Sequence, residues 1–178
     1  EELYLVASEK SVGKKIKFRG EEIAIENLES YDFSKAQITF FAAGSQIAKE
    51  WAPKAAKKTI VIDNSSYFRM QKDVPLVVPE VNAEDLNNHN NIISNPNCST
   101  MQMVLALKPL HDEYKIKRVV VSTYQAVSGA GKAPTDELFE QTQKYLENKK
   151  FNLKNFTKQI AFNLIPHIDT FDKDGYTK

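Results

Sequence analysis

The only cysteine of this chain, Cys98, lies in the segment Ser94-Asn-Pro-Asn-Cys-Ser-Thr100. The Asn-Pro-Asn run is typical of a turn, because proline fixes φ and asparagine tolerates unusual backbone angles. Apolar residues then recur at helical spacing, which predicts a helix from Thr100 to about Tyr114. Free N–H groups and the positive end of a helix dipole stabilise a thiolate, so this position favours a nucleophilic cysteine. The alternative is a small, buried apolar residue.

Composition excludes several classes of function. The chain has 178 residues, enough for one domain or two small ones, and its formal net charge is +1. We therefore expect no nucleic-acid or membrane partner, and we expect no metal site. One cysteine excludes an internal disulfide and is typical of a reducing compartment. With no signal peptide and no long apolar run, the sequence predicts a soluble, cytoplasmic location.

The first half alternates strands and loops and contains one clear helix, running through Trp51 to Lys57. The expected strands are Leu3–Ala7, a hairpin of Ile16–Phe18 and Glu22–Ile25, Ile38–Ala42, Thr59–Asp63, Leu76–Val78 and Ile92–Ile93. This rhythm is typical of a parallel α/β sheet, whose ligands bind beyond the carboxyl ends of the strands. Polar turns follow Ala7, Ala42, Asp63 and Ile93, and this shared edge favours a functional role for Cys98.

The second half has a different character. Arg118–Tyr124 is rich in β-branched residues and predicts a strand covered on both faces. A loop of small residues, 125–132, precedes a helix expected from Pro134 to about Glu147. In that helix Asp136 and Glu137 would occupy the first turn, and Leu138, Phe139 and Tyr145 its apolar side. A last strand is expected over Phe162–Pro166. We place a domain boundary near residue 97, giving domains 1–97 and 98–178.

Three motifs in order carry a family resemblance: residues 94–100, Tyr124-Gln-Ala-Val-Ser-Gly-Ala-Gly131, and Ile62-Asp-Asn-Ser-Ser66 with Phe68-Arg-Met70. Over essentially its whole length the chain closely resembles bacterial-type aspartate-semialdehyde dehydrogenases. The resemblance implies an α/β fold: an NAD(P)-binding Rossmann-like parallel sheet, followed by part of an α+β catalytic and dimerisation domain similar to that of glyceraldehyde-phosphate dehydrogenase.

The resemblance also implies an activity. The family reduces L-4-aspartyl phosphate to L-aspartate 4-semialdehyde and releases phosphate, in lysine/diaminopimelate, methionine and threonine biosynthesis. NADP is the implied cofactor, and a homodimer or homotetramer the implied assembly. Cys98 matches the nucleophile that carries the acyl group as a thioester, a role that suits a thiol because it attacks as the anion and leaves readily.

Further residues match family positions. Asn97 matches the catalytic neighbour of the cysteine, Gln125 the substrate-contacting glutamine, and Arg69 the arginine of the phosphate site. Cofactor contacts are implied for Ser8, Lys10, Ser11, Ala43, Gly44, Ser45, Ser128 and Gly129. The family often has arginine where this chain has Lys10, and the adjacent Glu9 is a mild argument for some use of NAD.

The resemblance leaves parts of the family pattern outside this sequence. The glycine-rich turn that should precede the first strand, the proton-accepting histidine and the substrate-binding glutamate and arginine have no match, so we expect a fragment with little catalysis of its own. His89, His111 and His167 are interpreted as structural. Alternatives are an N-acetyl-γ-glutamyl-phosphate reductase, disfavoured by Asn97 and Ser99, a cysteine acyl-transferase or hydrolase, and a catalytically silent dimerisation module.

Overall fold

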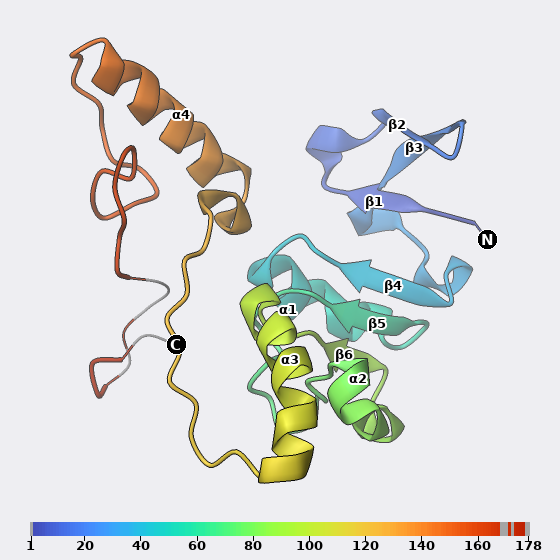
Figure 1. The fold of residues 1–178 in the computed structure, drawn as a ribbon. Coiled ribbons are helices and arrows are strands. Elements are labelled where there is room, and N and C mark those ends of the chain that lie inside the picture. The colour runs from blue at the N-terminus through green and yellow to red at the C-terminus, as the bar shows by residue number, and fades with distance from the viewer. Residues whose placement is uncertain (1, 168–170, 172, 177–178) are drawn as a thin grey trace. The chain divides into compact units, whose positions relative to one another are not determined.

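The computed structural model describes residues 2–167, 171 and 173–176, which form two compact units, Glu1–Val119 and Val120–Lys178 (Figure 1). Helix α3 (Cys98–Tyr114) belongs to the first unit, so the contacts divide the chain after residue 119. The domain boundary expected near residue 97 stays a prediction. The end of the expected second domain includes residues 168–170, 172 and 177–178, which lie outside the described residues.

The first unit opens with a mixed sheet of three strands in the order β1-β3-β2. The strands are β1 (Leu5–Ala7), β2 (Lys15–Phe18) and β3 (Glu21–Asn27). β3 is parallel to β1 and antiparallel to β2. Arg19 and Gly20 have positive φ values of 49° and 93°, the geometry that a two-residue hairpin turn requires. The expected hairpin is confirmed.

A second sheet of three parallel strands carries the core of this unit. Its order is β4-β5-β6, with strands β4 (Ile38–Phe41), β5 (Ile60–Asp63) and β6 (Ile92–Ser94). Helix α1 (Ser45–Ala55) connects β4 to β5 and packs on one face of the sheet through Ala48, Ala52 and Ala55 (Figure 1). These alanines recur at helical spacing, and their small side chains let the helix lie close to the sheet. The expected strands and helix are confirmed.

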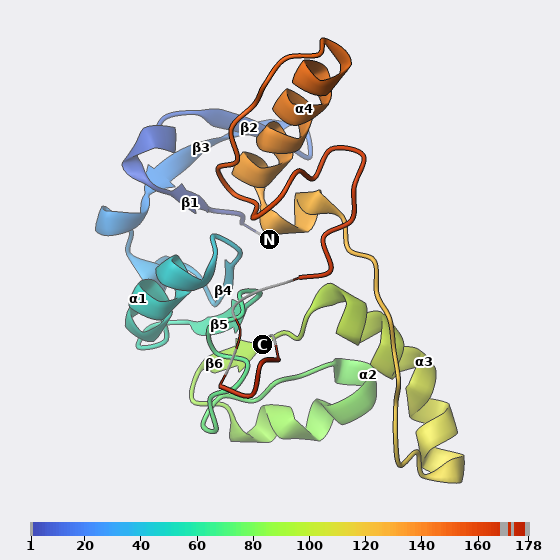
Figure 2. The same ribbon diagram turned by 90° about the vertical axis from the view of Figure 1, so that its left-hand side faces the viewer.

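The segment expected as a strand at Leu76–Val78 forms only one bridge, between Leu76 and Ser94 of β6. Pro75 lacks an N–H, and Pro79 begins the short helix α2 (Pro79–Asn82), so the ladder cannot extend in either direction. Helix α3 leaves the turn after β6 and contacts α2 (Figure 2). It begins at Cys98, two residues before the expected start.

The second unit differs most from expectation. Arg118–Tyr124 is not a strand, and it is exposed rather than covered, with Val120 81% exposed. A strand needs a neighbour for its N–H and C=O groups, and no described strand pairs with this segment. Phe162–Pro166 is not a strand either, because Phe162 adopts a positive φ of 57° and the Asn163 N–H closes a turn onto the Ile160 carbonyl.

Helix α4 (Lys132–Leu146) is confirmed but begins two residues early. Asp136 and Glu137 therefore lie beyond its first turn, so the helix dipole does not account for them. Phe139 and Tyr145, expected on the apolar side, are exposed, whereas Glu137 and Gln141 are buried. The buried positions of α4 are thus polar.

No helix in the described part of the chain has the length and apolar character needed to cross a lipid bilayer.

Replacing Phe41 by alanine should destabilise the first unit by about 3–5 kcal/mol, because its ring is buried in the core between the sheet and α1. The matched control is Phe40→Ala on the same strand, whose side chain is 73% exposed and should cost less than about 1 kcal/mol. Urea unfolding followed by the fluorescence of Trp51, the single tryptophan, measures both. An equal loss of stability in the two variants would contradict the assignment of Phe41 to the buried face of β4 and Phe40 to the exposed face.

Candidate active site

The carboxyl ends of β4, β5 and β6 form one edge of the parallel sheet, and backbone hydrogen bonds continue past the strands there. The Asn64 N–H donates to the Phe41 carbonyl at 2.9 Å, and the Asn95 N–H donates to the Asp63 carbonyl at 2.9 Å. The turns after β4, β5 and β6 are thereby held side by side. The expected shared edge is confirmed for the turns after Ala42, Asp63 and Ile93, whereas the turn after Ala7 follows β1, which belongs to the other sheet.

The turn after β5 is shaped by a buried carboxylate. Asp63 is fully buried and accepts hydrogen bonds from the Ser65 N–H at 3.0 Å and the Ser65 hydroxyl at 2.8 Å. The hydroxyl of Ser66 lies 2.9 Å from that of Ser45, at the start of α1. The motif at residues 62–66 therefore links two of the neighbouring turns.

Arg69 joins the turn after β5 to the turn that carries the cysteine. Its Nε donates to the Asn95 carbonyl at 2.8 Å, and its Nη2 donates to the Asn64 carbonyl at 3.4 Å. A guanidinium has five N–H donors, so three remain after these two bonds. The side chain is half-buried. Its bond to the Asn95 carbonyl, three residues before Cys98, places a positive charge at this edge.

Cys98 is the first residue of α3, and its thiol is exposed. The preceding residue, Asn97, is the N-cap: its Oδ1 accepts from the Ser99 N–H at 3.0 Å and the Ser99 hydroxyl at 2.6 Å. The Cys98 thiol also donates to this oxygen, at 3.8 Å. The expected position of Cys98 at a helix N-terminus is confirmed, and the buried apolar alternative is wrong.

Two further groups of expected cofactor residues lie in turns of the first unit. Ser8 precedes a short 3-10 helix, Glu9–Ser11, directly after β1, and Lys10 is exposed there. Gly44 has a φ of 91°, and a Cβ added to it would meet no atom within 4 Å. It precedes the 11-residue helix α1, whose first N–H groups lack partners within the helix. These turns follow β1 and β4.

The second unit holds the remaining expected residues. Ser128 and Gly129 lie in a 3-10 helix, Val127–Ala130, just after Gln125. Gln125 lines an open groove together with Ala126, Val127, Leu138, Ile160, Phe162, Asn163 and Leu164. Cys98 and Gln125 therefore belong to different units, each with its own described geometry.

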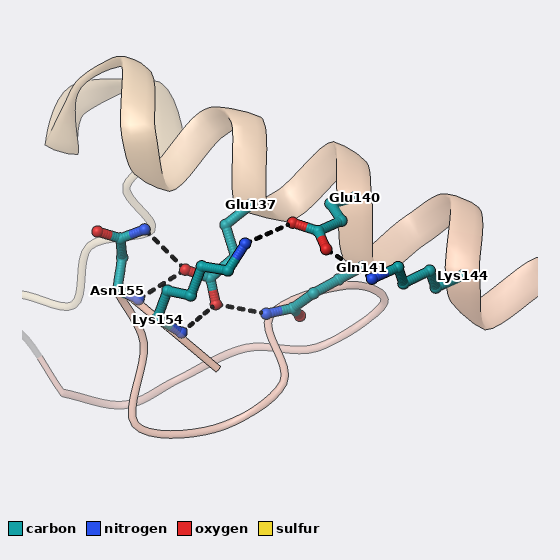
Figure 3. A network of polar contacts seen from close by, with 6 residues as sticks. All are labelled: Glu137, Glu140, Gln141, Lys144, Lys154 and Asn155. Carbon is teal, nitrogen blue, oxygen red and sulfur yellow. Dashed lines mark hydrogen bonds and ion pairs between the residues drawn. The ribbon is translucent and has the colours of Figure 1, made fainter. Parts of the chain in front are cut away.

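A polar cluster on α4 was not expected from the sequence (Figure 3). Glu137 is 3% exposed and Gln141 is fully buried. The Glu137 carboxylate accepts from the backbone N–H groups of Lys154 at 3.0 Å and Asn155 at 2.6 Å, and from the Asn155 side chain at 2.8 Å. The Gln141 side chain donates to the same carboxylate at 2.9 Å. Polar residues four apart on a helix, ahead of a loop, are the only sequence signal for such a cluster.

The charge of Glu137 is stabilised by these contacts. Burial acts to raise the pKa of Glu137, but the hydrogen bonds from Lys154, Asn155 and Gln141 outweigh it and lower that pKa. The nearby half-buried carboxylate, Glu140, pairs with Lys144 at 2.6 Å and Lys154 at 3.0 Å. Those side-chain pairs are solvent-exposed enough to add little stability.

Comparison with known proteins matches two family models to the chain. Residues 1–89 match the model of the semialdehyde dehydrogenase NAD-binding domain, and residues 107–178 match that of the semialdehyde dehydrogenase dimerisation domain. The chain belongs to the semialdehyde dehydrogenase family. Its fold is the expected α/β one, with an NAD-binding parallel sheet followed by part of a dimerisation domain.

Individual relatives of this semialdehyde dehydrogenase chain carry a more specific name. An aspartate-semialdehyde dehydrogenase of Aquifex aeolicus is 54% identical over the whole chain. The crystal structure of aspartate-semialdehyde dehydrogenase II from Vibrio cholerae, complexed with ASA, is 50% identical and has a TM-score of 0.94 over the whole chain. A Candida albicans enzyme of the same name, crystallised with NADP, is 26% identical and has a TM-score of 0.55 over 64% of the chain and 40% of its own.

The chain spans about half the length of the relatives it matches: 54% of the Aquifex enzyme and 54% of the Vibrio structure. The match to the NAD-binding domain model runs from β1 to the residues just before β6. The described residues contain no group of three or more His, Cys, Asp or Glu side chains that could hold a metal ion.

Replacing Asn97 by alanine should destabilise the N-terminus of α3 in this semialdehyde dehydrogenase by about 1 kcal/mol, because the Ser99 N–H loses its acceptor. Asn97→Asp should keep the cap, since aspartate serves there equally well. Hydrogen exchange at the Ser99 amide measures the effect. Loss of protection in both variants would argue against the cap.

The Glu137 contacts should weaken in acid. Because the pKa of Glu137 is lower in the folded state than in the unfolded state, its contribution is fully present above its ordinary value of 4.5. It should be lost as the pH falls through the lowered, folded value. Protection of the Lys154 and Asn155 amides against hydrogen exchange, corrected for intrinsic rates, measures this.

Glu137→Gln is the control for that pH series, because it cannot titrate. The difference in protection between the wild type and Glu137→Gln should shrink toward low pH. A difference that stays constant from pH 7 to about pH 3 would show that the charge of Glu137 is irrelevant to the segment.

Proposed function

We propose that the protein containing this chain is an NADP-dependent aspartate-semialdehyde dehydrogenase. It would reduce L-4-aspartyl phosphate to L-aspartate 4-semialdehyde and release phosphate. The observation that carries the proposal is the exposed Cys98 at the first position of α3, in a turn tied by Arg69 to the edge of an NAD-binding sheet. The relatives' shared name supports the same substrate.

Cys98 is the nucleophile of the proposed reaction. In the direction of aldehyde oxidation, the thiolate attacks the aldehyde carbon, a C–S bond forms and the oxygen takes up a proton. Loss of the hydroxyl proton to a base and of a hydride, for which bound NADP⁺ would be the acceptor, would convert the thiohemiacetal to a thioester. A phosphate oxygen then attacks the thioester carbonyl, the C–S bond breaks, and the thiolate leaves. The biosynthetic direction reverses these steps.

Asn97 and Arg69 would bind the oxygen and the phosphate attached to the reacting carbonyl carbon. The Oδ1 of Asn97 accepts the bonds that cap α3, so its Nδ2 group is the part that would donate to the oxyanion. Arg69 keeps three N–H donors after its bonds to the Asn64 and Asn95 carbonyls. Those donors would bind the phosphate that enters or leaves, which a planar fork does better than an ammonium group.

The turns of the first unit fit a phosphorylated dinucleotide. The exposed Lys10 ammonium, with Ser8 and Ser11, offers a cation and two hydroxyls for a 2′-phosphate. Gly44, with open space in place of a side chain, and the free N–H groups of α1 after it would admit a pyrophosphate, beside Ala43 and Ser45. When bound, NADP supplies the hydride chemistry.

The second unit carries the remaining residues to which the family resemblance gives a role. Gln125, exposed in the groove, can both donate to and accept from the substrate through its side-chain amide. Ser128 and Gly129 would contact the cofactor. The family's dimerisation domain supports oligomer formation, and we propose a homodimer or homotetramer.

Phosphate-dependent formation of NADPH from L-aspartate semialdehyde tests the proposal. The full-length protein carrying this sequence should be active, and Cys98→Ala should lose at least about a thousandfold in kcat, because no other described side chain is a cysteine. Omitting phosphate should stop turnover after one acyl-enzyme per site. The 178-residue chain alone should be inactive.

Arg69→Lys is the companion variant. It keeps the positive charge but loses the bidentate fork, so the KM for phosphate should rise while hydride transfer in the first turnover is retained. Full activity of Cys98→Ala, or turnover without phosphate, would refute the acyl-enzyme route. Activity without any nicotinamide would instead favour a cysteine hydrolase.

A further inference from the structure

Helix α4 carries two buried polar side chains, Glu137 and Gln141, for which the proposed chemistry has no use. Burying a carboxylate and an amide is unfavourable unless both are fully hydrogen-bonded. Their partners are therefore the key to their role. Outside α4, these two side chains are hydrogen-bonded to residues within 154–161, which form neither a helix nor a strand.

The two side chains hold opposite ends of this segment. Figure 3 shows the end at Lys154 and Asn155 and the bond between Gln141 and Glu137. Glu137 accepts the backbone N–H groups of Lys154 and Asn155 at its beginning. Gln141, one turn further along α4, accepts those of Ile160 at 2.9 Å and Ala161 at 3.3 Å at its end. The bond from the Gln141 amide to the Glu137 carboxylate joins the two acceptors. Side chains of α4 thus replace the ladder that a strand would have provided.

The held segment leads directly into one wall of the Gln125 groove. Ile160, at its end, and Phe162, Asn163 and Leu164, just after it, line the groove together with Gln125, Ala126 and Val127, which precede α4. Leu138, next to Glu137 on α4, lies in the groove as well. Residues before α4 and residues of the held segment therefore line one groove, and the two bonds to Gln141 fix the backbone where the second stretch begins.

We propose that Glu137 and Gln141 are positioning residues that set the width of the groove in which Gln125 contacts the substrate. Asn163 lines the same groove, and its Nδ2 donates to the Gln159 carbonyl at 2.8 Å, so its Oδ1 would be the second polar contact. The proposal rests on the proposed function only in taking Gln125 as the substrate-contacting residue. Neither positioning residue touches the groove itself.

The first test is structural and needs no activity. In the 178-residue chain, NMR should detect NOEs across the groove, between residues 125–127 and residues 160–164. Gln141→Met keeps the length of the side chain but removes the acceptor, so the cross-groove NOEs and the protection of the Ile160 and Ala161 amides should be lost. Gln143→Met, on the exposed side of the same helix, is the matched control and should keep both.

The second test is kinetic, in the full-length protein. Gln141→Met should raise the KM for the aldehyde about tenfold, because displaced groups bind the substrate poorly. The alkylation rate of Cys98 should stay within about twofold, since Cys98 lies in the first unit. A purely structural role would lower the yield of folded protein and leave the KM of the remainder unchanged.

The outcomes separate the two proposals. Cross-groove NOEs that persist in Gln141→Met, or an unchanged KM for the aldehyde after they are lost, would overturn the positioning role. An inactive wild type would refute the proposed function, while the NOEs would still decide the inference. If Gln141→Met does not fold, Glu137→Gln, which keeps size and shape, replaces it, with Glu140→Gln as its control.

Discussion

The direction of β4, β5 and β6 is the constraint on which the first unit depends. Since the strands are parallel, the turns that follow them must lie at one edge, and β5 lies between its two neighbours. Hydrogen bonds from Asn64 to Phe41 and from Asn95 to Asp63 extend the pairing beyond the strands. The cysteine turn is therefore anchored on the sheet before any side chain acts. Arg69 and Asn97 only refine a position that the backbone has already fixed.

The packing of α1 determines which face of that sheet is buried. The alanines of α1 bring the helix onto the face of Phe41 and Val61, where the residues are buried. Phe40, on the opposite face, remains exposed. Because a helix lies on the supported face, the turn between β4 and α1 is short and Gly44 has to turn the chain with a positive φ. The same packing thus determines the shape of the turn at the start of α1.

Local sequence was sufficient where an element and its partner lie close together. Buried strands separated by turns predicted β4, β5 and β6, and the Asn-Pro-Asn run predicted the entry to α3. It failed for Arg118–Tyr124, because β-branched residues favour an extended chain but do not provide a partner for its hydrogen bonds. It also failed for Glu137 and Gln141, since polar residues on a helix normally face solvent, and only the fold reveals a segment that needs acceptors.

The two units solve the same physical problem with opposite groups. A chain segment without a ladder leaves backbone groups unpaired, and each must find a partner if it is buried. In the first unit Arg69 donates to carbonyls, whereas in the second Glu137 and Gln141 accept N–H groups. One side chain then holds several backbone positions, so its loss displaces a whole segment rather than one contact. An exposed pair such as Lys132 with Asp136 holds no backbone, and solvent replaces it readily. The positions of the candidate site residues therefore depend on polar side chains that hold the backbone, including some that never touch the reacting atoms.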